Sequence, residues 1–253
     1  MRRPVFDEFT QELRRRLEPD PRVLGLVALG SMSGEPPEPD EWSDHDFFVV
    51  TRPGEQERMR SEVSWLPRAD EIVLAFRETA HGVKALYRDA HLLEFAVFDP
   101  DELGLARVNR YRVLFDRADI EARMGALRDR TARELGPPDA RWLQGQFLTG
   151  LLIAADRHRR GERISARARL QAAAADLVQL ARQQLPAPPG NVPDSLDPLR
   201  RVEAALPQFS AALDEALSLS PPAAALRMLA LARELPGFPV DPAAVLEHHL
   251  RSG

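Results

Sequence analysis

The first half of the chain alternates between patterns typical of helices and patterns typical of buried strands. Apolar residues recur at helical spacing over residues 5–17, and Pro19 ends this pattern. Continuous apolar runs of strand length follow at 23–29 and 47–50, and a helical pattern covers 55–66. Four further strands are predicted, at 72–76, 83–87, 92–98 and 111–115. These elements predict an N-terminal domain of mixed α and β structure.

The pattern changes at about residue 120, where strand signals disappear and Ala and Leu dominate. Two long helices are predicted at 139–160 and 163–185, joined at Gly161, a residue type that commonly follows a helix C-terminus. A proline-rich loop around 186–193 follows, and shorter helices are predicted at 197–206, 208–219, 222–235 and 241–250. We therefore expect a first domain over residues 1–118 and an all-helical domain over 119–253.

Composition excludes several classes of protein. The 253 residues are 44% hydrophobic and 29% charged, which excludes a disordered chain. The absence of cysteine excludes disulfides, thiolate zinc sites and cysteine nucleophiles. The apolar stretch 147–155 is too short to span a bilayer, and the N-terminus lacks the apolar run of a signal peptide. We expect a cytoplasmic protein without a membrane partner.

Charge is distributed unevenly within the net charge of −5. Residues 1–120 carry 24 acidic and 17 basic side chains, whereas residues 121–253 carry 15 acidic and 17 basic ones. Six arginines crowd into positions 157–169, opposed only by Glu162. An acidic half could hold metal ions and a locally basic half could hold phosphates, although a solvated helix face explains these arginines equally well. The negative net charge and the 6% aromatic content argue against a nucleic-acid partner.

The most informative segment lies between the two predicted strands 23–29 and 47–50. Gly30 and Ser31 follow the first strand, where a glycine allows close approach of a ligand and N–H and hydroxyl groups can contact phosphate oxygens. Asp44 and Asp46 enter the second strand two residues apart, so their carboxylates point to the same face. Two such charges repel each other unless a cation binds, and Mg²⁺ is typically held by one or two carboxylates plus substrate phosphates.

A third carboxylate is expected from a later strand. Glu94 lies within the apolar run 92–98, where a lone carboxylate is costly unless it is paired or bound to a metal. Asp89 and Asp99 are alternatives, but both lie at strand ends, where Asp is common for reasons of turn geometry. We therefore expect Glu94 to complete a site with the aspartate pair.

The pattern of these residues resembles that of the nucleotidyltransferase-fold superfamily. It consists of the Gly30-Ser31 pair, a gap of 12 residues, the Asp44-x-Asp46 pair and a carboxylate on a later strand. The smaller two-domain members that adenylylate aminoglycoside or lincosamide antibiotics are the most similar. The resemblance implies fold class α+β, with a mixed β-sheet and flanking helices followed by an all-α helical bundle that closes the substrate cleft. It implies transfer of a nucleoside monophosphate, with ATP or another nucleoside triphosphate as donor, to a hydroxyl of a small molecule such as an antibiotic.

The same resemblance implies roles for individual residues. Gly30 and Ser31 would contact the triphosphate, and Asp44 and Asp46 would hold one or two Mg²⁺ ions. Glu94 would complete the metal site or deprotonate the acceptor hydroxyl.

Two positions depart from the pattern of the family. His45 stands between the aspartates, where an apolar residue is usual, and Met32 stands where a basic residue often follows the Gly-Ser pair. The missing cation could come from the second domain, and we expect it from Arg160, Arg163 and Arg167. Two other functions remain open, which are a protein-adenylylating enzyme and a non-catalytic nucleotide-binding or regulatory module of the same fold.

Overall fold

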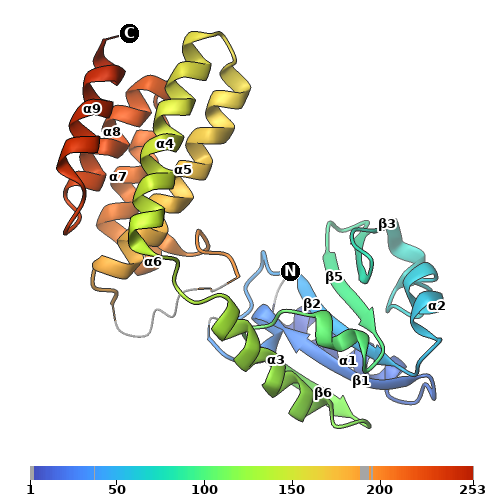
Figure 1. The fold of residues 1–253 in the computed structure, drawn as a ribbon. Helices are drawn as coiled ribbons and strands as arrows, with labels where there is room; N and C mark the ends of the chain where they lie inside the picture. Colours follow the sequence, from blue (N-terminus) through green and yellow to red (C-terminus); the bar gives the residue numbers. More distant parts are fainter. Residues whose placement is uncertain (1–2, 37, 189–193, 195, 253) are drawn as a thin grey trace. The chain divides into compact units, whose positions relative to one another are not determined.

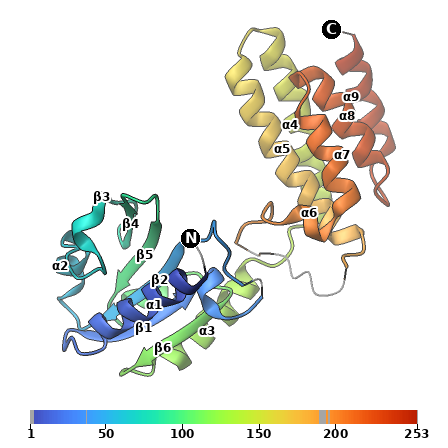
Figure 2. The same ribbon diagram turned by 180° about the vertical axis from the view of Figure 1, so that it is seen from behind.

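A computed structural model describes residues 3–36, 38–188, 194 and 196–252. The chain divides into two compact units, residues 1–134 and residues 135–253. The N-terminal unit contains strands and helices, and the C-terminal unit is helical in its described residues (Figures 1 and 2). The fold class α+β is therefore confirmed. None of the helices in the described ranges is long and apolar enough to cross a membrane.

The N-terminal unit is built on a six-stranded sheet with the strand order β3-β4-β5-β2-β1-β6. Strands β2 and β5 are parallel and the remaining neighbours are antiparallel, so the sheet is mixed, as expected. The strands are β1 (Val23–Leu29), β2 (His45–Thr51), β3 (Ile72–Arg77), β4 (Gly82–Tyr87), β5 (Leu92–Phe98) and β6 (Tyr111–Asp116). Each of the six lies where the apolar runs predicted a strand.

Helices cover both faces of this sheet (Figure 1). Helix α1 (Arg3–Leu17) buries Phe6, Phe9 and Leu13 against one face, together with Phe47 of β2. These residues share one side of the helix because they recur at three- and four-residue spacing. The short helix α2 (Gln56–Ser61) contributes Met59 to the same core, and it is shorter than the helix predicted over 55–66.

Helix α3 (Ile120–Glu134) covers part of the other face, and its apolar residues pack with Val27 and Val50 of the sheet. Ile120 rests on Gly25, where an added Cβ would lie 2.2 Å from the Ile120 Cδ1 atom. Sequence patterns did not predict α3 individually, because Arg, Glu and Asp fill most of the positions outside its narrow apolar face. Its packing assigns it to the N-terminal unit, so this compact unit extends along the chain to Glu134, beyond the boundary expected at residue 118.

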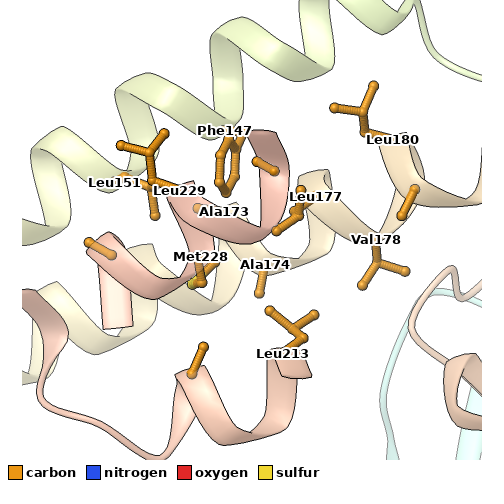
Figure 3. Packing of buried hydrophobic residues seen from close by; sticks show 14 of the residues in the cluster. Phe147, Leu151, Ala173, Ala174, Leu177, Val178, Leu180, Leu213, Met228 and Leu229 are labelled. Carbon is orange, nitrogen blue, oxygen red and sulfur yellow. The ribbon is translucent and has the colours of Figure 1, made fainter. Parts of the chain in front are cut away.

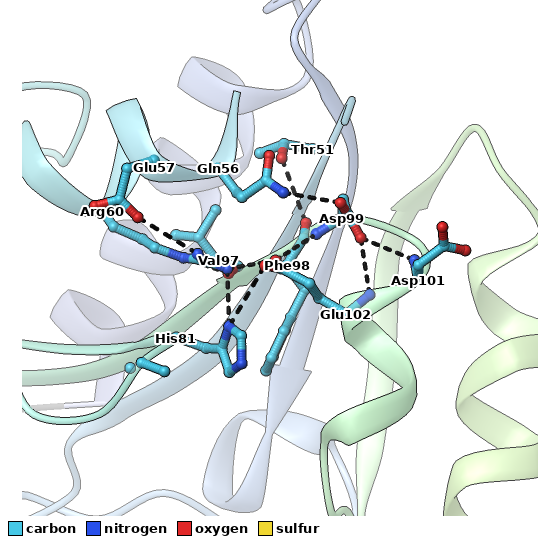
Figure 4. A network of polar contacts seen from close by, with 12 residues as sticks. Thr51, Gln56, Glu57, Arg60, His81, Val97, Phe98, Asp99, Asp101 and Glu102 are labelled. Atoms are coloured by element: carbon cyan, nitrogen blue, oxygen red, sulfur yellow. Dashed lines mark hydrogen bonds and ion pairs between the residues drawn. The ribbon is translucent and has the colours of Figure 1, made fainter. Parts of the chain in front are cut away.

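A buried guanidinium ties α2 to the sheet and to the 3-10 helix η3 (Glu102–Leu105) (Figure 4). The Arg60 side chain is 5% exposed. Its Nε donates to the Val97 carbonyl at 2.9 Å, and its Nη2 lies 2.5 Å from Glu102 Oε2 and 3.0 Å from His81 Nδ1. The single guanidinium therefore satisfies groups from two stretches of chain, at His81 and at 97–102, that lie 21 to 42 residues beyond Arg60.

The helical unit consists of two long helices and four shorter ones among its described residues. They are α4 (Ala140–Arg159), α5 (Arg163–Gln184), α6 (Val202–Ala205), α7 (Pro207–Leu217), α8 (Pro221–Arg233) and α9 (Val240–Arg251). Phe147, Leu177 and Met228 meet in its core (Figure 3). The Asp139 carboxylate caps α4 by accepting a hydrogen bond from the Trp142 amide at 2.8 Å.

Three details of this unit differ from or extend the sequence predictions. Gly161 has a φ of 81° between α4 and α5, as a C-terminal glycine should. The helix predicted over 197–206 is shorter, because only Val202–Ala205 is helical. The proline-rich loop predicted around 186–193 lies mostly outside the described residues.

Candidate active site

Two of the predicted acidic residues are direct neighbours in the sheet. Strands β2 and β5 run parallel, and the register places Asp46 opposite Glu94. Residues paired in register project to the same face of a sheet. The two carboxyl-bearing residues therefore share one face, although 48 positions separate them in the sequence. This face is the one opposite α1, since His45 and Phe47 point toward that helix.

The Gly-Ser turn lies beside the same aspartate. Gly30 begins the 3-10 helix η1 (Gly30–Ser33) with a φ of 50°, and an added Cβ would lie 3.2 Å from Asp46 Oδ2. A side chain there would be both strained and in close contact with the carboxylate, so glycine suits the position on two grounds. Ser31 is 6% exposed, and its hydroxyl oxygen has no hydrogen-bond partner among the described residues. A buried hydroxyl without a partner is costly, which makes Ser31 a candidate for contact with a ligand.

Glu94 has a partner that the sequence analysis missed. The Lys84 ammonium on β4 lies 2.8 Å from Glu94 Oε1 and 2.9 Å from Glu78 Oε1. Hydrogen bonding to these two carboxylates, first to Glu94, raises the pKa of Lys84, so the lysine is charged. The Glu94 side chain is 36% exposed, which differs from the fully buried position that the apolar run suggested. The face of the sheet around Glu94 is partly open to solvent, and the register places Lys84 directly opposite it.

His45 points away from the aspartates on either side of it. It is fully buried, and its ring stacks on Phe6 of α1 at a centroid distance of 3.8 Å. Its Nε2 lies 3.1 Å from the Phe6 carbonyl, which can only accept, so this nitrogen carries the proton. Its Nδ1 then accepts a hydrogen bond from His91 Nε2 at 2.8 Å. The unusual residue between the two aspartates is thus part of the core and does not enter the candidate site.

The same surroundings keep both histidines neutral. Burial, and to a lesser extent the neighbouring His91, lower the pKa of His45 to about 3. Burial also lowers the pKa of His91 to about 4. His91, which directly precedes β5, is therefore the hydrogen-bonding partner of His45 at the start of β2.

Asp44 lies one residue before β2 and lines a pocket of about 510 Å³. The pocket is also lined by Trp42, Asp89 and His91. The Trp42 side chain is 85% exposed, so its indole is available to a ligand. Asp89 accepts a hydrogen bond from Arg68, whose Nη2 lies 2.8 Å from the Asp89 Oδ2 atom. The pocket therefore brings carboxylates and an exposed aromatic ring to the edge of the sheet where β2 begins.

The fit of these residues to Mg²⁺ can be tested on the geometry. The described residues contain no group of three or more His, Cys, Asp or Glu side chains that could hold a metal ion together. Glu94 is held by Lys84, which competes with a cation for its carboxylate. Two carboxylates with phosphate oxygens make an ordinary Mg²⁺ site, and Asp44 and Asp46, two residues apart at the start of β2, have the chemistry for it. Metal binding by this pair stays a prediction. Metal binding by Glu94 stays a prediction.

The three arginines predicted to contact phosphate lie at the turn between α4 and α5. Arg160 is paired with Glu162, at 2.9 Å from Nε to Oε1. Arg163 and Arg167 lie in the first two turns of α5. These residues belong to the C-terminal unit, whereas Asp46 and Glu94 belong to the N-terminal unit. Contact of Arg160, Arg163 and Arg167 with a triphosphate therefore also stays a prediction.

Comparisons with known proteins give distant structural likenesses. No family model and no curated protein matches the sequence. A nucleotidyltransferase-like protein of Exiguobacterium sibiricum is 13% identical with a TM-score of 0.33, over 97% of this chain and 78% of that chain. An aminoglycoside 6-adenyltransferase of Bacillus subtilis is 13% identical with a TM-score of 0.31, over 95% and 90%.

A third solved structure is the CD-NTase CdnG of Bradyrhizobium diazoefficiens in complex with GTP. It is 11% identical with a TM-score of 0.27, over 98% of this chain and 82% of that chain. At these TM-scores we draw no functional conclusion from the likenesses.

Proposed function

We propose that the protein is a Mg²⁺-dependent nucleotidyltransferase that transfers a nucleoside monophosphate, AMP when ATP is the donor, to a hydroxyl of a small molecule. One observation carries the proposal, which is the meeting of Gly30, Asp46 and Glu94 at one place on the sheet. An added Cβ on Gly30 would lie 3.2 Å from Asp46, and Asp46 lies opposite Glu94 in register. The residues to which the family resemblance assigned phosphate, metal and acceptor chemistry lie directly after β1, in β2 and in β5, and this supports the proposal.

The chain's own groups have distinct tasks in this reaction. Asp44 and Asp46 would hold the ion, and when bound it neutralises charge on the triphosphate and on departing pyrophosphate. Gly30 leaves room for the phosphates beside Asp46, and the buried Ser31 hydroxyl donates a hydrogen bond to a phosphate oxygen. Glu94 accepts the proton of the acceptor hydroxyl. The acceptor oxygen forms a bond to the α-phosphorus. At the same time the bond between the α-phosphorus and the oxygen that bridges it to the β-phosphate breaks, and pyrophosphate leaves.

Lys84 has a supporting task in the same scheme. Its ammonium contacts Glu94 Oε1 at 2.8 Å and so fixes the position of that carboxylate on the open face. The other Glu94 oxygen is the one that would face the acceptor. A positioned base contributes typically 10²–10⁴-fold to a rate.

The test is pyrophosphate release with four nucleoside triphosphates, Mg²⁺ and a panel of hydroxylated acceptors. Asp46→Asn removes a carboxylate charge with little change in shape, and we expect turnover to fall by about 100-fold or more while the circular dichroism spectrum is retained. Asp129→Asn, an exposed carboxylate on α3, is the matched control and should leave turnover unchanged. Turnover of Asp46→Asn equal to that of the wild type would refute the proposal.

One observation favours the alternative of a non-catalytic nucleotide-binding module. The acidic residues in the described part of the chain do not form a three-carboxylate metal centre, and Lys84 occupies Glu94. Such a module would bind a fluorescent ATP analogue with Mg²⁺ and release no pyrophosphate with any acceptor. The same set of assays therefore separates the two functions.

A further inference from the structure

The N-terminal unit has a second pocket, between α3 and the 3-10 helix η3, with a volume of about 470 Å³. Its floor is apolar, since Leu103 and Leu127 are buried there. Its walls carry three guanidinium groups, those of Arg123, Arg130 and Arg133. These arginines follow one another at seven- and three-residue spacing, which places them on one face of α3.

Two of the three guanidinium groups are held in place by backbone carbonyls of the facing segment. Arg123 Nη1 donates to the Pro100 carbonyl at 3.2 Å. Arg130 donates through Nη1 to the Gly104 carbonyl at 2.6 Å and through Nη2 to the Ala106 carbonyl at 2.8 Å. A guanidinium carries five N–H donors, so each of these two keeps donors for another partner. Groups that are positioned before a ligand arrives lose less conformational entropy when it binds.

The charge in this pocket is opposite to that of the unit around it. Residues 1–134 carry 27 acidic and 21 basic side chains. The pocket lining carries three guanidinium groups and one carboxylate, that of Asp101. One further carboxylate lies nearby, because Glu134 Oε1 is 3.5 Å from Arg130 Nε. Even with Glu134 counted, the cluster has a positive charge, and it therefore suits an anion.

The pocket is separate from the candidate active site. Glu94 lies in the first half of β5, and the chain reaches Pro100 and Asp101 only after the other end of that strand. The four residue-to-residue steps from Glu94 to Phe98 alone span about 13 Å in a strand. A ligand in this pocket would therefore not be the nucleotide that contacts Asp46.

We propose that this pocket is a binding site for the phosphate group of a small phosphorylated molecule. Guanidinium groups bind phosphate oxygens through paired N–H donors, and a phosphate dianion matches the excess positive charge of the lining. The apolar floor at Leu103 and Leu127 accommodates the organic part of the ligand. The volume lies in the range of small-molecule sites.

The experiment is a titration of the full chain with inorganic phosphate and with phenyl phosphate, followed by amide resonances and compared with chloride at equal ionic strength. We expect saturable shifts at residues 100–105 and 123–133, with phenyl phosphate binding at least about threefold more tightly than inorganic phosphate, because its ring covers the apolar floor. Shifts confined to Gly30–Ser33, or shifts no larger than those with chloride, would overturn the proposal. The outcome does not depend on whether the protein transfers nucleotides.

Variants test the role of the arginines. The double variant Arg123→Gln/Arg133→Gln should weaken phenyl phosphate binding at least about tenfold, because charge-assisted hydrogen bonds are lost. The single variant Arg133→Gln, at an exposed position, should weaken it at least about threefold. The matched control is Arg128→Gln on the same helix, whose guanidinium stacks on Tyr111 and does not line the pocket. Its affinity should stay within twofold of the wild type. Wild-type affinity in Arg133→Gln and in the double variant would reject the site.

Discussion

The buried guanidinium of Arg60 gives the sharpest prediction about stability. In Arg60→Leu the Val97 carbonyl loses its donor at 2.9 Å and Glu102 loses its cation. Removing one partner of a buried pair destabilises a protein by about 3–5 kcal/mol. The Glu102 side chain is 26% exposed and can recover part of its hydration, which places the expected loss near the lower limit, at about 3 kcal/mol.

Arg58→Leu is the matched control, because it makes the same change two residues earlier in the same helix. The Arg58 side chain is 64% exposed and lies 3.7 Å from Glu62, so its loss should cost about 0–1 kcal/mol. Both replacements substitute leucine for arginine within α2, and these two residues have similar helix propensities. The difference between the variants therefore reports the burial of the Arg60 contacts.

The assay is urea unfolding of the full chain in a Trp142→Phe background. Trp142 is the tryptophan of the helical unit, so fluorescence then reports Trp42 and Trp65 of the N-terminal unit. With a slope of about 2 kcal/mol per molar urea, Arg60→Leu should lower the midpoint by about 1.5 M, and Arg58→Leu by less than about 0.5 M. Equal midpoints for the two variants would refute the assignment of Arg60 as a buried structural cation.

Three further predictions concern pH, the sheet and the helical core. The pKa values of His45 and His91 are about 3 and about 4 in the folded chain, below the ordinary value of 6.5, so the stability that the two neutral histidines contribute is fully present above pH 7 and is lost as the pH falls from about 6.5 toward 4. The free energy of unfolding at pH 5 should be roughly 4 kcal/mol lower than at pH 8. A difference below about 1 kcal/mol would contradict this prediction. Gly25→Ala forces a methyl group against Ile120 and should destabilise the N-terminal unit by about 1–3 kcal/mol in urea unfolding, whereas Gly104→Ala, with open space around it, should not cause an overpacking loss. Phe147→Ala empties the centre of the helical core and should cost about 3–5 kcal/mol in thermal or urea unfolding of that unit, followed by helical circular dichroism.

Local patterns in the sequence were sufficient for most of the fold. Strand β1 coincides with the apolar run at 23–29, and β5 with the run at 92–98, because buried strands need continuous apolar residues. The observed ends of the long helices α4 and α5 lie within one residue of the predicted ends. Residues such as Asp139 and Gly161 mark these ends in the sequence, because they favour a helix start and a helix end. Helix α3 escaped prediction because its apolar face is narrow and most of its other residues are charged.

The candidate site divides in the same way. That Gly30 follows a buried strand, and that Asp44 and Asp46 are two positions apart at the start of another, is visible in the sequence. The side on which His45 lies was not predicted, and the structure shows it buried against Phe6 of α1.

Only the tertiary structure decided which distant residues meet. The pairing register of β2, β5 and β4 brought Glu94 between Asp46 and Lys84, and it brought His91 to His45 beneath α1. A shift of one residue in any of these pairings would turn every side chain of a strand to the opposite face. Register is set by the packing of both faces at once, which no local segment contains. The sequence by itself therefore determined the elements and the residue types of the site, and the packed sheet decided that Glu94 has a lysine for a partner.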